Sequence, residues 1–280
     1  MSIEVQLSDA IDLLKSLPLG SVQIIATDPP YGIAYHSNHY KNKNPHAPVM
    51  NDWNFEPDLF FQAASDALQD GGAMYVFTRW DMFPIWAGLL PPSLILKNAI
   101  IWVKDNWSAG DLEGDFGYQY EIIMFIVKGR HIRVGHRYSN VWTVPRIPAK
   151  KLLHPTEKPV ELYRRMLTFS VHEGDLVVDP FCGSGPLGEA AKELNVRVLL
   201  GDIDPKMIRA SCNRLQISLP NNLPKEATQK LPACPIYKVK MPDPHLWGIH
   251  PEDMAYFKGC GVVEEKTIFE AMSDLPQEDE

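Results

Sequence analysis

The four residues Asp28-Pro29-Pro30-Tyr31 combine a carboxylate, a rigid turn and an aromatic ring in one short span. The prolines restrict the backbone to extended conformations, which would hold the Asp28 carboxylate, the Pro29 carbonyl and the Tyr31 ring in fixed relative positions. Two fixed acceptors can bind the hydrogens of an amino group, and an aromatic face can stack on a planar ring. Taken alone, the same run is also typical of a turn that ends a strand.

A glycine-rich run, Asp179-Pro-Phe-Cys-Gly-Ser-Gly185, follows an apolar stretch and precedes a predicted helix. Glycines let the backbone turn sharply and let a ligand approach it closely. Asp202 stands about twenty residues further on, at the end of the next predicted strand, where a carboxylate can accept hydrogen bonds from ribose hydroxyls. This spacing favours the nucleoside-binding half of a Rossmann-like unit over a tight connection that Asp179 merely caps.

A dinucleotide site is the competing interpretation, because Gly183, Gly185 and Gly188 also match the pattern G-x-G-x-x-G. Two residues argue against it. Pro186 opens the helix and has no backbone N–H to donate to a pyrophosphate. The carboxylate of Asp179 would repel a pyrophosphate, whereas it suits a cationic sulfonium cofactor that carries an amino group.

The run from Asp179 to Gly185 resembles the S-adenosylmethionine motif D-P-F-x-G-S-G-T of amino DNA methyltransferases, with Pro186 in place of the usual threonine. Asp28-Pro-Pro-Tyr31 resembles the D-P-P-Y catalytic motif of the same family. The aspartate form is similar to adenine-N6 enzymes, whereas cytosine-N4 enzymes more often carry serine. The resemblance implies methyl transfer to the exocyclic amine of a flipped DNA base, with adenine N6 as the expected atom.

Two further segments resemble motifs of that family. His154-Pro-Thr-Glu-Lys-Pro159 is similar to H-P-T-Q-K-P, which lies beside the methionine end of the cofactor; by composition it is also a helix start, with Thr156 near the cap and Pro159 in the first turn. Leu7-Ser8-Asp9-Ala10 is similar to a G-D-A segment near the cofactor adenine, but Asp9 equally suits the first turn of a helix. The catalytic candidates are Asp28, Pro29, Pro30 and Tyr31, and the cofactor-binding candidates are Asp9, Asp28, Thr156, Lys158, Asp179, Phe181, Gly183, Ser184, Gly185 and Asp202.

Alternating apolar runs and amphipathic segments must position these residues, and they indicate an α/β fold. Strands are expected at 3–7, 22–27, 73–77, 94–103, 121–127, 176–178 and 196–200, and helices at 9–17 (with Ser8 as N-cap), 57–68, 159–171, 187–194 and 206–217. The alternation predicts a Rossmann-like, mostly parallel sheet with helices on both faces.

The order of the motifs, catalytic before cofactor, resembles the β group of amino methyltransferases, a circular permutation of the common layout. In that group the strand before Asp9 would lie close to residues 175–217. We therefore expect one catalytic domain over residues 1–220 and a C-terminal extension of unknown role over 221–280.

A basic segment, residues 128–165, holds ten lysines and arginines but two acidic residues. Its part from 128 to 153 lies where the β group carries its target-recognition region, and it is short, which favours a short target or relaxed specificity. The candidate DNA contacts are Lys128, Arg130, Arg133, Arg137 and Arg146. The polar loop 35–48 is a candidate lid over a flipped base, or simply a surface loop.

Composition limits the other possibilities. The net charge is −8 and 45% of residues are hydrophobic, yet no apolar run approaches the ~20 residues that span a bilayer, and no signal peptide is evident. The four cysteines are widely spaced and suggest no zinc site, so no metal is expected and the protein is expected to be cytoplasmic. Expected partners are double-stranded DNA, with single-stranded DNA as an alternative, and no membrane; the resemblance adds a homodimer and a cognate restriction endonuclease.

Three rival functions stay open at the level of sequence. An NAD-dependent oxidoreductase would leave Asp28-Pro-Pro-Tyr31 unexplained. A non-catalytic DNA-binding module is disfavoured because Asp28 and Tyr31 are both present. A cytosine-N4 enzyme, or a methyltransferase acting on RNA or on a protein amide, would use the same chemistry on a different amine, and the sequence separates this alternative least well.

Overall fold

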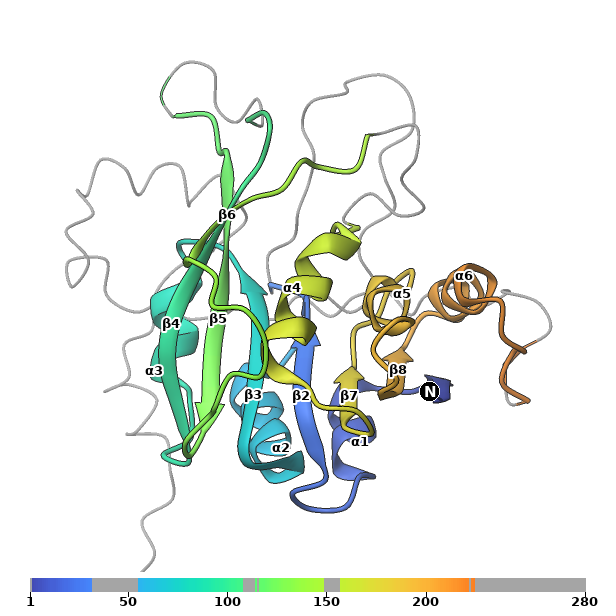
Figure 1. The fold of residues 1–280 in the computed structure, drawn as a ribbon. Coiled ribbons are helices and arrows are strands. Elements are labelled where there is room, and N and C mark those ends of the chain that lie inside the picture. The colour runs from blue at the N-terminus through green and yellow to red at the C-terminus, as the bar shows by residue number, and fades with distance from the viewer. Residues whose placement is uncertain are drawn as a thin grey trace, which may run out of the picture. The chain divides into compact units, whose positions relative to one another are not determined.

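The computed structural model describes residues 2–31, 55–107, 114, 116–148, 157–221 and 223–224. Within them an eight-stranded sheet has the order β1-β8-β7-β2-β3-β5-β4-β6 (Figure 1). The strands are β1 (Ser2–Leu7), β2 (Val22–Thr27), β3 (Leu68–Thr78), β4 (Leu94–Val103), β5 (Tyr120–Lys128), β6 (Val141–Thr143), β7 (Leu176–Asp179) and β8 (Arg197–Asp202). The helices are α1 (Ala10–Lys15), α2 (Pro57–Ala67), α3 (Phe83–Gly88), α4 (Val160–Ser170), α5 (Pro186–Ala191) and α6 (Pro205–Leu215).

Five neighbouring strands, from β1 to β3 in the sheet order, pair in parallel. Every residue of β2 is buried, as expected of a parallel strand that is covered on both faces. The carboxyl ends of these strands therefore meet at one edge of the sheet, the upper edge in Figure 1. The expected mostly parallel α/β sheet is confirmed.

Strand β5 is the exception, because it runs antiparallel to both of its neighbours, β3 and β4. Ile122, near its start, pairs with Thr78 at the end of β3, whereas Val127, near its end, pairs with Ala73. The first residues of β5 thus lie at the same edge as the carboxyl ends of the parallel strands, and its last residues lie at the opposite edge. Nothing in the sequence pattern predicted this reversal.

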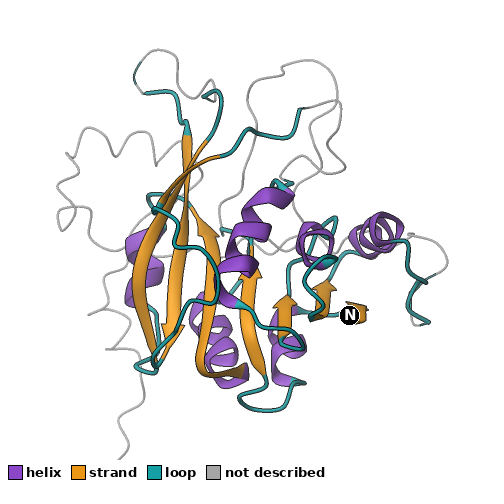
Figure 2. Cartoon of the chain, viewed as in Figure 1, coloured by secondary structure: helices purple, strands orange, loops and turns teal. Residues whose placement is uncertain are grey.

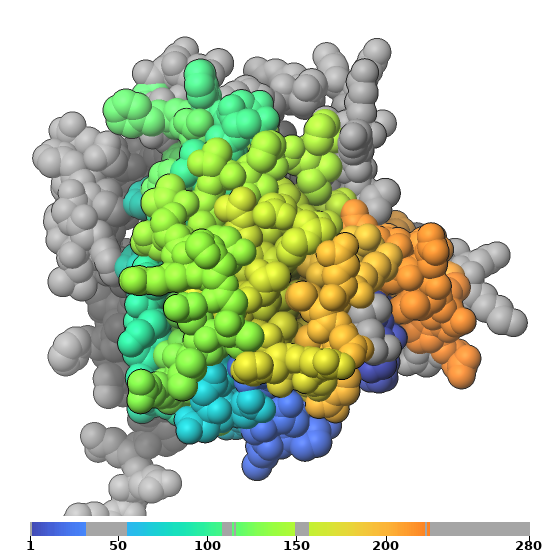
Figure 3. Space-filling model, viewed as in Figure 1, coloured from blue at the N-terminus to red at the C-terminus, as the bar shows by residue number. Residues whose placement is uncertain are grey.

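The helices form two layers, with α4, α5 and α6 on one face and α1, α2 and α3 on the other (Figures 1 and 2). One core cluster includes Leu162 and Leu187 beneath the first layer, and a second includes Phe60 and Trp86 beneath the other. Figure 3 views the face formed by α4–α6 and the chain that follows β5. The expected helices on both faces are present.

Two elements were not predicted, and several boundaries differ. Helix α3 and strand β6 are short and lie where no clear periodicity marks them. Helix α1 is capped by Asp9, whose Oδ1 accepts from the backbone N–H groups of Ile11 and Asp12, so the expectation of Ser8 as N-cap was wrong. Helix α4 begins at Val160, and Pro159 is its N-cap residue rather than part of the first turn.

The pairing of β1 with β8 realises the permuted chain order. The two strands are parallel from Ser2 opposite Arg197 to Leu7 opposite Asp202, and the N–H of Ser8 then donates to the carbonyl of Asp202 at 3.0 Å. The strand before Asp9 therefore lies beside the elements of 175–217, as expected. All described residues belong to one compact unit, Met1–Gln229; the boundary near residue 220 stays a prediction. No helix in the described ranges could cross a membrane.

Candidate active site

Three carboxylates gather at the carboxyl edge of the parallel strands. Asp28 directly follows β2, Asp179 ends β7 and Asp202 ends β8, and these strands are neighbours in the sheet. In open α/β sheets this edge is where ligands bind, because the loops that leave the strands diverge there. The two motifs that lie far apart in the sequence are therefore side by side in the fold.

Both carboxylate oxygens of Asp28 have a partner. The hydroxyl of Tyr31 donates to Oδ1 at 2.7 Å, and the ammonium of Lys158 lies 2.8 Å from Oδ2. Burial raises the pKa of Asp28, an effect that Lys158 opposes. Burial, and the neighbouring Asp28 charge, also hold the pKa of Tyr31 well above its usual range, so the phenol stays protonated and able to donate. The carboxylate is thus held in one orientation.

Lys158 contacts the catalytic motif; the contact with the methionine end of the cofactor that its own motif suggests stays a prediction. Its Nζ pairs with Asp28 and also with Oε2 of Glu121 at 3.1 Å, while Oε1 of Glu121 pairs with Lys104 at 2.6 Å. The Lys158 ammonium lies 5.3 Å from the ring centroid of Phe77, a cation–π contact. Its two anionic partners hold the pKa of Lys158 above its usual range despite burial.

Sequence reasoning missed Glu121 and Lys104. Glu121 opens an apolar strand and Lys104 follows another, and such single charges beside strands are ordinary surface residues in most proteins. The signal that identifies them is the reversed direction of β5, which brings its first residues to the Asp28 edge. That direction was not in the sequence pattern.

The glycine-rich loop between β7 and α5 is fixed by short bonds. Oδ2 of Asp202 accepts from the N–H of Gly183 at 2.9 Å, and Ser211 donates to the Gly183 carbonyl at 2.7 Å. Gly185 has φ +78° and is the N-cap of α5, where an added Cβ would lie 2.9 Å from Oγ of Ser211. Pro186 occupies the start of the helix without strain, as expected for this departure from the motif.

Asp179, the last residue of β7, precedes this loop and is shielded from solvent. It is fully buried, and its Oδ1 accepts from Oγ1 of Thr27 at 2.6 Å and from the N–H of Phe181 at 3.1 Å. Its Oδ2 is buried without a hydrogen-bond donor among the described residues. Burial raises its pKa to about 8, and the charges of Asp28 and Asp202 add to the effect.

Two further cofactor candidates have defined surroundings. The half-buried ring of Phe181 packs against Phe60 with a centroid distance of 5.6 Å. Buried Ser184 accepts a 3.4 Å bond from Arg214 of α6, which also pairs with Glu157. Glu157 stands where the motif usually has glutamine, so the substitution is matched by a cation on α6.

Asp9 and Thr156 remain less defined. Asp9 lies next to the end of β8, and its carboxylate caps α1, which is the interpretation from helix chemistry; contact with a cofactor stays a prediction. Thr156, residues 149–155 of the basic segment and the loop 35–48 lie outside the described residues.

The candidate DNA contacts do not lie together. Lys128 ends β5 at the edge opposite Asp28, and its ammonium donates to the carbonyls of Ser65 and Leu68 at 2.7 and 2.8 Å. Arg130 and Arg133 follow Lys128 directly; Arg133 donates to the carbonyl of Gly135, and His131, between them, contacts Gly71 at the start of β3. These three basic residues thus lie at the edge opposite Asp28, because β5 is reversed; their contact with DNA stays a prediction.

The remaining two basic candidates do not belong to the group that follows the end of β5. Arg137 and Arg146 are both exposed. The N–H of Arg146 donates to Asp105, two residues beyond the end of β4, at 3.0 Å. Because β4 ends at the same edge as β2, Arg146 lies on the catalytic side of the sheet.

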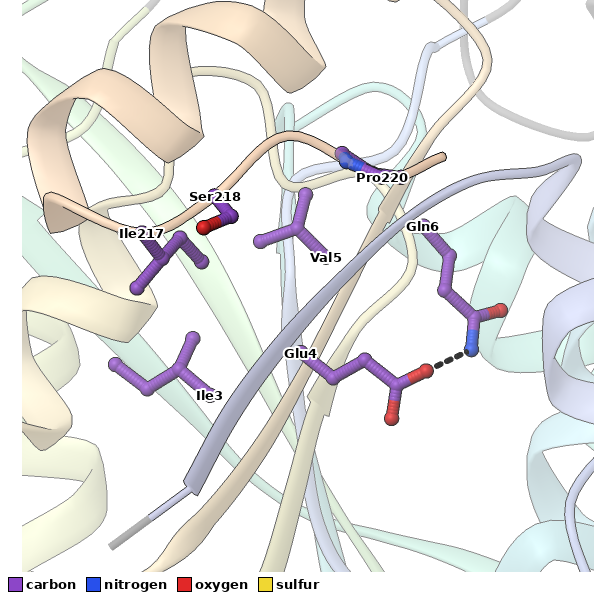
Figure 4. A pocket seen from close by; sticks show the side chains of 7 residues that line it. All are labelled: Ile3, Glu4, Val5, Gln6, Ile217, Ser218 and Pro220. Atoms are coloured by element: carbon purple, nitrogen blue, oxygen red, sulfur yellow. Dashed lines mark hydrogen bonds between the residues drawn. The ribbon is translucent and has the colours of Figure 1, made fainter. Parts of the chain in front are cut away.

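A shallow groove also lies along the outer strand β1, beside Ile217 and Pro220 (Figure 4). Its polar side chains are Ser218, Glu4 and Gln6, and Nε2 of Gln6 donates to Glu4 at 2.6 Å. It contains no motif residue.

The residues at the catalytic edge fit a cationic nucleoside cofactor. The unpartnered Oδ2 of Asp179 is an acceptor suited to a positive group, and Asp202 is a half-buried acceptor at the strand end. A Cβ built at Gly183 meets nothing within 4 Å in the described part of the chain, which leaves the loop backbone open to a ligand. Three or more metal-ligating side chains do not cluster anywhere in that part.

Comparison with known proteins agrees with this geometry. The family model described as DNA methylase matches residues 22–213. The type II methyltransferase M.HpaI of Haemophilus parainfluenzae is 28% identical over 235 residues, which cover 74% of this chain and 72% of that protein. The DNA adenine methyltransferase YhdJ of Escherichia coli (strain K12) is 26% identical over 253 residues, with 75% and 81% covered.

Solved structures share the fold. The M1.HpyAVI–SAM complex has a TM-score of 0.57 at 22% identity and covers 76% of this chain and 100% of its own. The PvuII DNA methyltransferase, described as cytosine-N4-specific, has a TM-score of 0.61 at 15% identity, with 80% and 89% covered. These likenesses confirm the expected Rossmann-like methyltransferase fold.

Proposed function

This chain belongs to the DNA methylase family, and we propose that it transfers a methyl group from S-adenosylmethionine to N6 of adenine in DNA. The observation that carries the proposal is the Asp28 carboxylate, held in one orientation beside a glycine-rich nucleoside loop. The name of YhdJ, an adenine methyltransferase, and the aspartate form of the catalytic motif support adenine as the target. The order of the motifs supports membership of the β group.

The residues of the catalytic motif would prepare the amine. The lone pair of an exocyclic amine is delocalised into its ring, which makes the nitrogen a poor nucleophile. An ionised carboxylate has about four acceptor sites. Tyr31 and Lys158 occupy two of those sites on the Asp28 carboxylate. Asp28 and the Pro29 carbonyl can therefore each accept one amino hydrogen, which favours a pyramidal nitrogen with a directed lone pair. The Tyr31 ring can stack on a base that has left the duplex.

S-adenosylmethionine, when bound, supplies a methyl group on a sulfonium sulfur. Gly183, Ser184, Asp179 and Asp202 are the residues that would hold it, with Phe181 beside them. The nitrogen would gain positive charge as its bond to the methyl carbon forms and the bond from that carbon to sulfur breaks. Asp28 would stabilise that charge and could accept the proton that the nitrogen then loses. Positioning and electrostatics would supply most of the rate.

For the DNA surface Arg146 has the strongest support, because it lies on the catalytic side of the sheet. Lys128, Arg130 and Arg133 lie at the opposite edge and stay candidates without support from this geometry. Exposed Arg137 and the segment up to residue 153 remain candidates for target recognition. A homodimer and a cognate endonuclease are proposals that rest on the family alone.

The test is methyl transfer from labelled S-adenosylmethionine to duplex DNA of mixed sequence. We expect Asp28→Ala to lower turnover by about 100-fold or more, because the preorganised acceptor is lost. Asp58→Ala, at an exposed carboxylate in the first turn of α2, is the matched control and should leave turnover unchanged. Equal activity in the two variants would exclude Asp28 from the reaction.

A further inference from the structure

Four charged side chains alternate in sign along one line through the catalytic edge. Asp28 pairs with Lys158 at 2.8 Å, Lys158 with Glu121 at 3.1 Å, and Glu121 with Lys104 at 2.6 Å. They come from the loop after β2, the segment before α4, the second position of β5 and the residue after β4. We call Asp28, Lys158, Glu121 and Lys104 the charge row.

The charge row is largely shielded from water. Lys158 is the most buried member, with its side chain 8% exposed, and Asp28, Lys104 and Glu121 are 18, 15 and 21% exposed. A long lysine side chain has many rotamers, and one buried partner seldom fixes it. Here the ammonium also contacts Glu121 at 3.1 Å and lies 5.3 Å from the ring centroid of Phe77.

We propose that Glu121 is a positioning residue, which, with Lys104 behind it, holds Lys158 against the carboxylate of Asp28 and so fixes the aim and the charge of that carboxylate. This inference rests on the proposed function, because it assigns a purpose to the orientation of Asp28. Glu121 itself would touch neither the base nor the cofactor.

The electrostatic effect on Asp28 follows from its surroundings. The titratable groups that face it are Tyr31 and Lys158 from its own loop and the α4 side, Tyr163 on α4, Glu121 on β5 and Asp179 on β7. Of these, Lys158 lowers the pKa of Asp28, whereas Glu121 raises it by like-charge repulsion. Removing the charge of Glu121 and removing that of Lys158 must therefore move the Asp28 titration in opposite directions.

Three variants separate the effect of Glu121 on the orientation of the Asp28 carboxylate from its effect on the charge of that carboxylate. Glu121→Ala removes the charge and both ion pairs, so kcat should fall by about tenfold or more while KM for the cofactor changes little. Glu121→Gln keeps an oxygen that can accept from Lys158, so it should restore most of kcat at alkaline pH and move the acid limb of the pH profile to lower pH. Lys158→Met should move that limb up.

The decisive readout is the Asp28 titration itself, followed by NMR of the full chain with ¹³C-labelled aspartate carboxyls and assigned with Asp28→Asn. Glu161→Gln is the matched control, since Glu161 lies on α4 in exposed pairs with Arg164 and Arg165. We expect a lower Asp28 midpoint in Glu121→Gln and no change in Glu161→Gln. An unchanged or higher midpoint in Glu121→Gln, which should fold because it is isosteric, would overturn the inference.

The methyl-transfer assay tests the proposed function, and the Asp28 titration tests the role of Glu121, so either can fail without the other. If the wild type transfers no methyl group to DNA but the midpoint falls as expected, the proposed function is wrong and the charge row stands. If the wild type is active and Glu121→Ala retains full kcat, the charge row is structural and the proposed function stands.

Discussion

The burial of the Asp179 carboxyl costs the fold free energy, and a role in ligand binding would explain why this position holds an aspartate. Its carboxyl is fully buried, it accepts two hydrogen bonds at Oδ1, and Oδ2 has no donor in the described part of the chain. Residues with perturbed pKa values concentrate at functional sites, because there the environment is arranged for a ligand. A cationic cofactor would supply the missing partner.

Asp179→Asn should stabilise the cofactor-free protein in a pH-dependent manner. The pKa of Asp179 is about 8 in the folded chain and about 4 in the unfolded chain, so ionisation disfavours folding increasingly as pH rises between these values. Asparagine keeps the acceptor for Thr27 and cannot ionise. We expect a gain of about 5 kcal/mol in the free energy of unfolding at about pH 9, shrinking towards zero near pH 4.

Urea unfolding at several pH values measures this difference, and calorimetry on the same samples measures cofactor affinity. Affinity should fall in Asp179→Asn at about pH 9 as stability rises, because the charge that suits the cofactor is gone. A stability difference that is independent of pH would contradict the account of Asp179.

At the scale of elements, helix α6 contacts the glycine-rich loop between β7 and α5 through Arg214. This residue bonds to Ser184 in the loop and pairs with Glu157, whose side chain is 1% exposed, just before α4. The Arg214 guanidinium thus connects α6 to the glycine-rich loop and to the segment before α4 that contains Lys158. Breaking a buried pair leaves a charge without its partner, which costs more than the pair contributes.

Arg214→Met should lower the free energy of unfolding by about 3 kcal/mol. In a Glu157→Gln background, with the residue usual in the motif, the same change should cost only about 1 kcal/mol, because no buried carboxylate remains. Denaturant unfolding of the four proteins in this cycle gives the coupling energy. Costs that simply add would show that Glu157 and Arg214 are not a pair.

The direction of one strand separates what the sequence could predict from what it could not. Strands β2 and β4 are apolar runs with clear ends, and both were predicted with their observed bounds. The motifs predicted the two loops that hold Asp28 and the glycines. The reversal of β5 depends on pairing between distant segments, and it explains both why Glu121 was omitted and why Lys128 lies at the edge opposite Asp28.

At the scale of the whole molecule, the folded unit should not need the chain beyond residue 229. The two core clusters are built from residues between Val5 and Leu223 among those described, and the family match ends at residue 213. We expect a chain of residues 1–229 to unfold cooperatively, with a free energy of unfolding within about 1 kcal/mol of the full chain. Loss of cooperative unfolding in the shortened chain would show that residues 230–280 complete the core.

Whether this molecule methylates adenine N6 in DNA is decided by the nucleoside composition of duplex DNA after incubation with enzyme and S-adenosylmethionine. We expect N6-methyladenine in the digest of the wild-type reaction and none with Asp28→Ala. N4-methylcytosine would keep the mechanism and contradict the assigned base. A digest without any methylated base, from protein that binds the cofactor, would contradict DNA as the substrate.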